Sequence, residues 1–135
     1  MSRHASGTFE VKLDPQTPDA SGLGRLTLDK IFHGDLEATS LGQMLAASTD
    51  TPGSAGYVAL ERVTGTLAGR SGTFVLQHTG TMNRGTPSLS VTVVPDSGTG
   101  QLTGLSGTLS ITVVDKEHVY ALEYSFADIE GATGL

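Results

Sequence analysis

Hydrophobic and polar side chains alternate along most of this 135-residue chain, and turn sequences interrupt the alternation about every dozen residues. A period of two is typical of β-strands that bury one face. Eight segments follow the pattern, over residues 8–13, 24–33, 36–49, 56–68, 73–83, 88–94, 107–115 and 118–126. The sequence therefore predicts an all-β protein, with residues 1–135 forming a single domain.

Residues 36–47 also fit a helix, because Leu41, Met44 and Leu45 stand at helical spacing and Asp35 could cap the first turn. The alternation favours a strand over this helix. The longer gaps are predicted as loops or turns, namely 14–22, 50–54 and 95–107, with Gln101 and Leu102 as a short extra strand in the last of them.

Two predicted hairpins assign the faces of the strands. A turn at Arg70 and Ser71 pairs Leu67 with Phe74. One face then carries Tyr57, Ala59, Glu61, Val63, Leu67, Phe74, Leu76, His78 and Met82. A turn at Lys116 and Glu117 pairs Val113 with Tyr120 and adds Leu109, Ile111, Leu122, Tyr124 and Phe126 to this inner face. The opposite face, which includes Leu60 and several threonines, suits solvent or a partner subunit.

Eight consecutive strands joined by tight turns predict a small, mostly antiparallel β-barrel, because closure removes the exposed edges of a sheet. A two-sheet sandwich is the alternative. The interior of an eight-stranded barrel is either filled by side chains or holds one small ligand.

Composition excludes several classes of function. Eight basic and fourteen acidic residues give a net charge of -6, which argues against binding to nucleic acid or anionic membranes. The chain has no cysteine, no long apolar run and no apolar stretch near its start, so we expect a cytoplasmic protein. Dinucleotide, P-loop, zinc-protease and serine-hydrolase motifs are absent from the sequence, and we expect no cofactor.

Glu61 and His78 are the candidate catalytic residues. The predicted hairpin places them diagonally on neighbouring strands of an apolar face. Burial disfavours the charged form of each group alone, whereas pairing favours it, so either group could be tuned for proton transfer. A structural ion pair that fixes the register of the barrel is the alternative.

The remaining inner-face residues are candidates for a ligand-binding wall: Tyr57, Phe74, Leu76, Met82, Tyr120, Leu122 and Tyr124. Their apolar surfaces fit a hydrophobic small molecule.

His33, Asp35 and Glu37 formally resemble part of a metal site. We interpret Gly34 and Asp35 instead as a hairpin turn, with Asp35 pointing outward and Lys30 paired with a carboxylate across the hairpin, and we predict no metal. His4 and His118 are interpreted as surface residues.

Five stretches of the sequence, over residues 7–12, 28–40, 53–65, 74–82 and 93–107, resemble a bacterial family catalogued as a domain of unknown function, DUF3224. The first reads GTFEVK, and the second includes KIFHGDLEATS. The resemblance implies a β-barrel of the allene oxide cyclase type, the fold of plant dirigent proteins and some bacterial cyclases. It also supports the strand over residues 36–47.

Relatives of this fold bind a reactive hydrophobic molecule and act largely by positioning it. The resemblance implies a hydrophobic ligand and a homo-oligomer, either a dimer or a trimer. Three hypotheses follow: a cofactor-free isomerase or cyclase that uses Glu61 and His78, a non-catalytic binding or scavenging protein, and a filled structural barrel that acts through subunit contacts.

Overall fold

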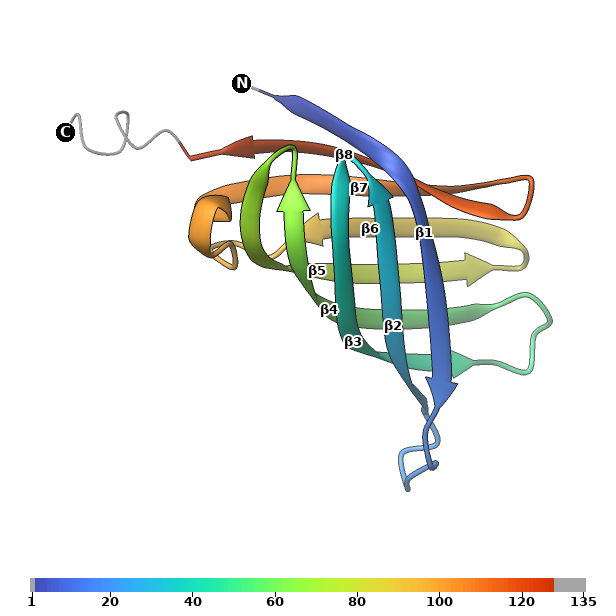
Figure 1. The fold of residues 1–135 in the computed structure, drawn as a ribbon. Coiled ribbons are helices and arrows are strands. Elements are labelled where there is room, and N and C mark those ends of the chain that lie inside the picture. Colours follow the sequence, from blue (N-terminus) through green and yellow to red (C-terminus); the bar gives the residue numbers. More distant parts are fainter. Residues whose placement is uncertain (1, 128–135) are drawn as a thin grey trace.

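The computed structural model describes residues 2–127, which form one closed barrel of eight antiparallel strands (Figure 1). Each strand pairs with the next along the chain, and β8 pairs with β1 to close the barrel. The strands are β1 (Arg3–Pro15), β2 (Gly24–Gly34), β3 (Leu36–Ser48), β4 (Ala55–Leu67), β5 (Arg70–Asn83), β6 (Thr86–Val93), β7 (Leu105–Val114) and β8 (Glu117–Phe126). The predicted antiparallel barrel is confirmed, and the sandwich is excluded.

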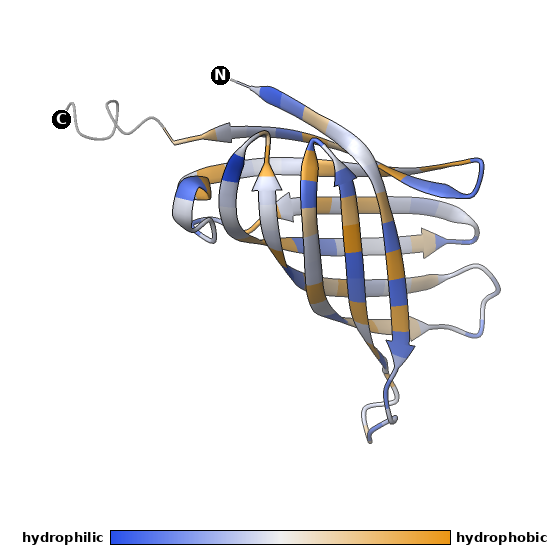
Figure 2. Ribbon diagram, viewed as in Figure 1, coloured by the Kyte–Doolittle hydropathy of each residue, from blue (hydrophilic) through white to orange (hydrophobic). Residues whose placement is uncertain are grey.

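The alternation of side chains positions the core. Hydrophobic and hydrophilic residues follow one another along β1, β2 and β3 (Figure 2). Buried and exposed positions alternate in the same way along β2 and along the first half of β3. The largest fully buried side chains include Tyr120, Phe32, Phe74, Leu36, Leu67 and Leu102. Residues 36–47 lie in β3, so the strand predicted there is confirmed.

Tight turns set the register of the hairpins. The β4–β5 turn lies at Ala68 and Gly69, whose φ angles are 48° and 87°. Leu67 therefore pairs with Arg70 and not with Phe74, so the turn predicted further along the chain is wrong. A two-residue turn with positive φ at both positions favours glycine, which Gly69 supplies. The register differs by an even number of residues, and the predicted inner face is therefore preserved.

The β7–β8 hairpin differs in the same way. Its turn lies at Asp115 and Lys116, so Val113 pairs with His118 and not with Tyr120.

Residues 100–102 form a 3-10 turn, η1 (Gly100–Leu102), so the short strand predicted there is wrong. Leu102 is fully buried and covers one end of the barrel. No helix within residues 2–127 is long and apolar enough to cross a membrane.

The two ends of the barrel differ. The core cluster fills the end near η1 and the β2–β3 turn, where Leu36, Leu67 and Leu102 are fully buried. At the other end, near the β3–β4 and β5–β6 turns, Leu13 and Met82 are each more than 40% exposed. The seam between β6 and β7 is also weak, since Thr92 and Thr108 form the single pair that joins these strands in the described residues.

Candidate functional site

Four buried polar residues meet inside the barrel, one from each of β2, β3, β4 and β5. Glu61 on β4 is 1% exposed, and its Oε2 accepts hydrogen bonds from Nζ of Lys30 at 2.7 Å and from Nε2 of His78 at 2.5 Å. The hydroxyl of Ser40 donates to Oε1 of Glu61 at 2.6 Å. The prediction that Glu61 and His78 lie diagonally on neighbouring strands is confirmed, because His78 pairs with Ala59 and Glu61 with Leu76.

The partners of Glu61 keep it ionised. Burial by itself raises the pKa of the carboxyl, but the hydrogen bond from His78, the charge of Lys30 and the hydrogen bonds from Lys30 and Ser40 together lower it from 4.5 to about 2. Opposite charge and donated hydrogen bonds both favour the carboxylate. Glu61 is therefore a buried anion at neutral pH.

A glycine makes room for this anion. Gly42 on β3 pairs with Glu61 across the strands. A Cβ atom on residue 42 would lie 2.8 Å from Cβ of Glu61 and would also overlap the carbonyl oxygen of Leu60. The missing side chain therefore lets β3 and β4 approach closely at Glu61.

A cavity of about 230 Å³ lies next to these polar groups, and side chains from all eight strands line it. Lys30 and His78 lie in its wall, together with Ala59. The rest of the lining is Phe9, Val11, Leu13, Leu28, Met44, Tyr57, Leu89, Ile111 and His118. The structure thus brings the candidate catalytic pair to the edge of a mostly apolar cavity.

Aromatic rings pack against the ammonium group of Lys30 at the cavity wall. Nζ of Lys30 lies 4.7 Å from the ring centroid of Phe9 and 5.7 Å from that of Phe32. Both distances are within the range of cation–π attraction. The ring of His118 stacks on Phe9 with centroids 4.9 Å apart. The interpretation of His118 as a surface residue is wrong, because it is half-buried and lines the cavity.

A second hollow of about 380 Å³ adjoins the cavity, since Met44, Tyr57 and Leu89 line both spaces. The ring of Tyr57 packs against Gly80, because a Cβ atom on residue 80 would overlap the ring. Burial raises the pKa of Tyr57, and the charge of Glu61 raises it further. Tyr57 is therefore a neutral hydrogen-bond donor at the junction of the two hollows.

The structure divides the predicted ligand-binding residues into two groups. Tyr57 lines the cavity, and Met82 lines the adjoining hollow. The other five are buried in the hydrophobic core and line neither space: Phe74, Leu76, Tyr120, Leu122 and Tyr124. The alternation of side chains gives the face of a residue, but it does not show at which height along the barrel axis the interior is open.

Lys30 and Ser40 are members of the site that the sequence analysis did not identify. Lys30 does pair with a carboxylate, but the partner is Glu61 on β4 and not a residue across the β2–β3 hairpin. The sequence contains evidence for the buried position of Lys30, because Lys30 lies between Leu28 and Phe32 in the row of alternate, inward-facing residues of β2. Lysine is almost never fully buried without a charged partner, so its place in that row predicts an internal anion.

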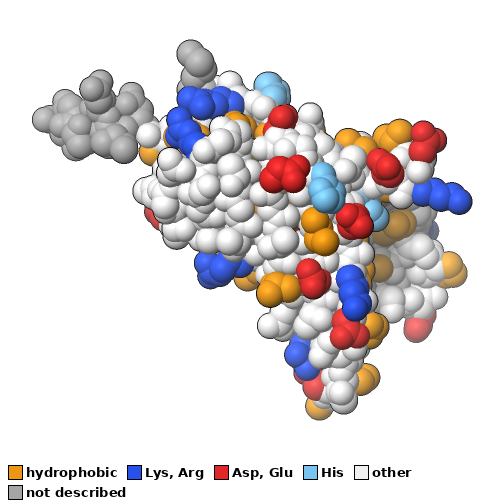
Figure 3. Space-filling model, viewed as in Figure 1, with side chains coloured by type: hydrophobic (Ala, Val, Ile, Leu, Met, Phe, Trp, Pro, Cys, Tyr) orange, Lys and Arg blue, Asp and Glu red, His pale blue; other side chains and the backbone are white. Residues whose placement is uncertain are grey.

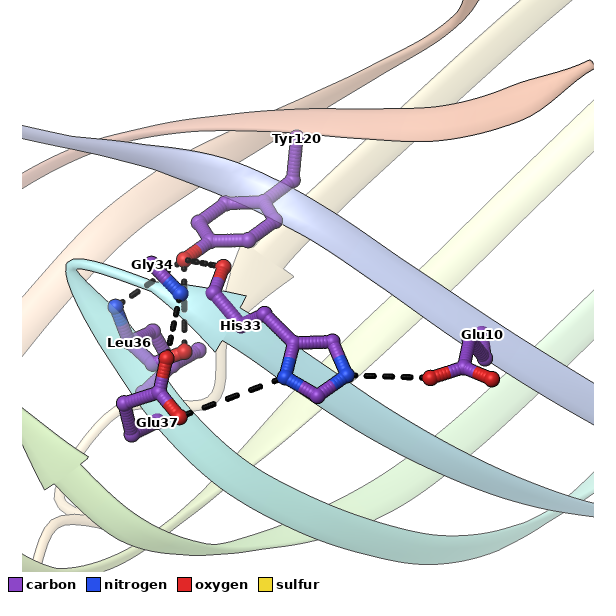
Figure 4. Close-up of polar contacts among 6 residues, drawn as sticks. All are labelled: Glu10, His33, Gly34, Leu36, Glu37 and Tyr120. Atoms are coloured by element: carbon purple, nitrogen blue, oxygen red, sulfur yellow. Dashed lines mark hydrogen bonds and ion pairs between the residues drawn. The ribbon is translucent and has the colours of Figure 1, made fainter.

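Tyr120 fixes the β2–β3 turn at the packed end (Figure 4). Its hydroxyl accepts a hydrogen bond from N–H of Leu36 at 2.9 Å and donates to the carbonyl oxygen of His33 at 3.0 Å. Nε2 of His33 lies 2.9 Å from Oε2 of Glu10, and Glu37 accepts from N–H of Gly34 (Figure 4). These contacts stabilise the turn.

Asp35 is exposed, as expected for the turn, and its Oδ2 accepts from the backbone N–H of Ser6 at 3.0 Å. No cluster of three or more metal-ligating side chains occurs among residues 2–127. His4 is a surface residue, with 74% of its side chain exposed.

The outer surface carries charges of both signs. Acidic, basic and histidine side chains are interspersed on the face in Figure 3. Leu41, Val58 and Leu60 are exposed on the outer side of β3 and β4. The outward direction predicted for Leu60 is confirmed.

Comparison with protein families matches residues 5–124 to the family described as "Protein of unknown function (DUF3224)". The chain is also similar to a solved structure, that of a protein of unknown function from the DUF3224 family of Shewanella oneidensis MR-1. The two are 47% identical, the TM-score is 0.91, and the match covers 95% of this chain and 99% of that chain. A comparison with curated proteins finds no match.

Proposed function

Because this chain belongs to the DUF3224 family, whose function is unknown, we propose its function from the geometry of the barrel: it binds a small, largely apolar molecule in the cavity at its open end. The molecule carries a hydrogen-bond-accepting oxygen that lies against the ammonium group of Lys30, beside His78 in the cavity wall. This is a binding function, which does not depend on catalysis.

The composition of the cavity wall carries the proposal. Most of the lining is aliphatic or aromatic, and the polar groups in it are Lys30, Tyr57, His78 and His118. Lys30, Tyr57 and His118 can each donate a hydrogen bond, whereas the hydrogen on Nε2 of His78 bonds to Glu61, and no carboxylate among residues 2–127 lines the cavity. Apolar pockets with a few convergent polar groups are the usual form of small-molecule sites. A donor-rich end selects an oxygen acceptor on the ligand.

The size of the cavity limits the ligand. A volume of about 230 Å³ is below the usual range for drug-sized ligands, about 300–1,000 Å³. A compact ketone, phenol or short carboxylic acid fits this space, and a longer apolar chain has room in the adjoining hollow.

A titration with 2-indanone, a compact apolar ketone, tests the proposal by NMR. We expect the backbone amide shifts of Ala59, His78 and Ile111 to move together and to saturate. The Ala59→Phe variant fills the cavity and should weaken binding at least tenfold. Thr112→Leu is the matched control, because Thr112 follows Ile111 but points outward, and it should bind as the wild type does.

Shift changes confined to the outer face, for example around Leu60, would contradict the proposal. Equal affinity of the wild type and the folded Ala59→Phe variant would contradict it as well. The circular dichroism spectrum of each variant shows whether the barrel is intact.

A further inference from the structure

We infer that the barrel catalyses proton transfer at a carbon next to a carbonyl group, with Nδ1 of His78 as the general base and the ammonium of Lys30 as hydrogen-bond donor to the substrate oxygen. The inference rests on the proposed binding function, and it adds a substrate class, enolisable carbonyl compounds, and a reaction.

The contact between His78 and Glu61 determines the tautomer of the imidazole. Oε2 of Glu61 already accepts from Lys30, and an ionised carboxylate has no hydrogen to donate. The hydrogen in the bond between Glu61 and His78 therefore belongs to Nε2 of the imidazole. In the neutral ring Nδ1 is then unprotonated, and its lone pair is free to accept a proton.

The free nitrogen faces the cavity. His78 lines the cavity, and its hydrogen bonds within the described residues involve Nε2 and not Nδ1. Residues 2–127 contain no fully enclosed side-chain nitrogen or oxygen that lacks a hydrogen-bond partner. Nδ1 is therefore accessible, and the cavity is the space next to it.

Glu61 acts as a positioning residue. A carboxylate bonded to one nitrogen of an imidazole orients the ring and stabilises the imidazolium that forms when the other nitrogen takes a proton, as in catalytic triads. Ser40 donates to the second oxygen of Glu61 and so fixes the plane of the carboxylate.

Lys30 supplies the electrophilic group. Its Nζ has three hydrogens, and Glu61 is the one hydrogen-bond acceptor that the described residues place near it. Nζ of Lys30 and Nε2 of His78 bond to the same oxygen of Glu61, so the two side chains lie side by side at the cavity wall. A substrate whose carbonyl oxygen binds Nζ of Lys30 therefore has its α-carbon near His78.

The reaction is a proton shift without oxidation or reduction. Nδ1 of His78 takes a proton from the α-carbon, and the electron pair of the broken C–H bond forms the C=C bond of an enolate. The enolate oxygen takes the negative charge and accepts a hydrogen bond from Nζ of Lys30. The imidazolium then returns the proton to the same carbon or, in a β,γ-unsaturated ketone, to the γ-carbon, which gives the conjugated ketone and completes an isomerisation.

The tautomer of His78 can be measured on the wild-type protein by nitrogen-15 NMR of the histidine side chains. We expect Nε2 of His78 to give the signal of a protonated ring nitrogen and Nδ1 that of an unprotonated one at neutral pH. A protonated Nδ1 with an unprotonated Nε2 would overturn the inference. Glu61→Gln should weaken the tautomer preference, and Glu61→Asp should partly restore it.

Activity is tested by incubating the protein with 2-indanone in heavy water and following the loss of its α-proton NMR signals. We expect exchange to be faster than in buffer and to fall about 100-fold in His78→Asn, the scale of general-base catalysis. His4→Asn is the matched control, since His4 also faces a carboxylate, that of Glu123, but 74% of its side chain is exposed and it does not line the cavity. It should retain exchange within about twofold.

Wild-type exchange no faster than that of His78→Asn would overturn the inference. A loss of exchange in His4→Asn equal to that in His78→Asn would overturn it also. Amide shifts recorded on the same samples report occupancy of the cavity separately. If the amide shifts change but α-proton exchange is not accelerated, the binding function is supported and the catalytic one is contradicted. If neither the shifts nor the exchange rate changes, both proposals are contradicted.

Discussion

Lys30, Ser40, Glu61 and His78 show how single residues place charge inside an apolar barrel. Burial of a lone lysine or glutamate is costly because each loses its hydration. Here the carboxylate of Glu61 receives a hydrogen bond from each of the other three residues. Removing either Lys30 or Glu61 leaves the charge of the other residue buried without its partner, which typically costs about 3–5 kcal/mol.

Glu61→Gln should therefore lower the free energy of unfolding at neutral pH by about 3–5 kcal/mol. The folded-state pKa of Glu61 is lowered from 4.5 to about 2, so its stabilising effect is present above pH 4.5 and is lost as the pH falls toward 2. Urea unfolding of wild type and variant across this range should show the difference shrinking as the pH falls.

Glu117→Gln is the control for this pH dependence, because Glu117 is exposed and is not in an ion pair within the described residues. A difference between wild type and Glu61→Gln that stays constant from pH 6 to pH 2 would contradict the assignment of Glu61 as a buried anion.

Tyr120→Phe tests the other polar contact inside the barrel. The variant leaves N–H of Leu36 and the carbonyl of His33 without the hydroxyl that bonds them, and we expect a loss of about 1–3 kcal/mol in the free energy of unfolding. Tyr124→Phe is the matched control, because Tyr124 is also buried but its hydroxyl bonds to no described residue. Equal losses in the two variants would show that the Tyr120 hydroxyl does not stabilise the turn.

Among the elements, the hairpin turns carry measurable strain. Ala68 has a φ of 48°, a left-handed conformation that alanine adopts at a cost and that asparagine and glycine tolerate better. Ala68→Asn should raise the free energy of unfolding by roughly 0.5–1 kcal/mol in a urea titration. Ala47→Asn at an exposed position of β3 should give no gain. A destabilised Ala68→Asn variant would be inconsistent with this turn.

The elements could largely be predicted from the sequence, because alternation fixes the face of each residue without fixing its partner. The face of Glu61 and His78 was correct even though the predicted turn at Arg70 and Ser71 was wrong. The position of the turn depends on which pair of residues adopts positive φ, here Ala68 and Gly69. Because Gly69 and Gly72 flank Arg70 and Ser71, the local sequence suggested a turn at that pair as well. The 3-10 turn at Gly100–Leu102 depends on contacts with β5, for example the hydrogen bond from N–H of Ser71 to Gln101, which no local pattern shows.

At the scale of the whole molecule, the sequence predicted a barrel but not which end of it is open. The end near Tyr120 is filled because Leu102 covers it and the β2–β3 turn bends over it. At the other end small residues such as Ala59 leave space beside Lys30 and His78. This asymmetry depends on the combined size of side chains from all eight strands, so it emerges only when the barrel closes.

Native mass spectrometry of the protein, purified gently from its own host, tests the binding cavity most directly. We predict that the wild type retains a small organic molecule and that the folded Ala59→Phe variant, purified in the same way, does not. Two proteins free of any bound molecule, or two that retain it equally, would contradict the account of an open cavity beside Lys30 and His78.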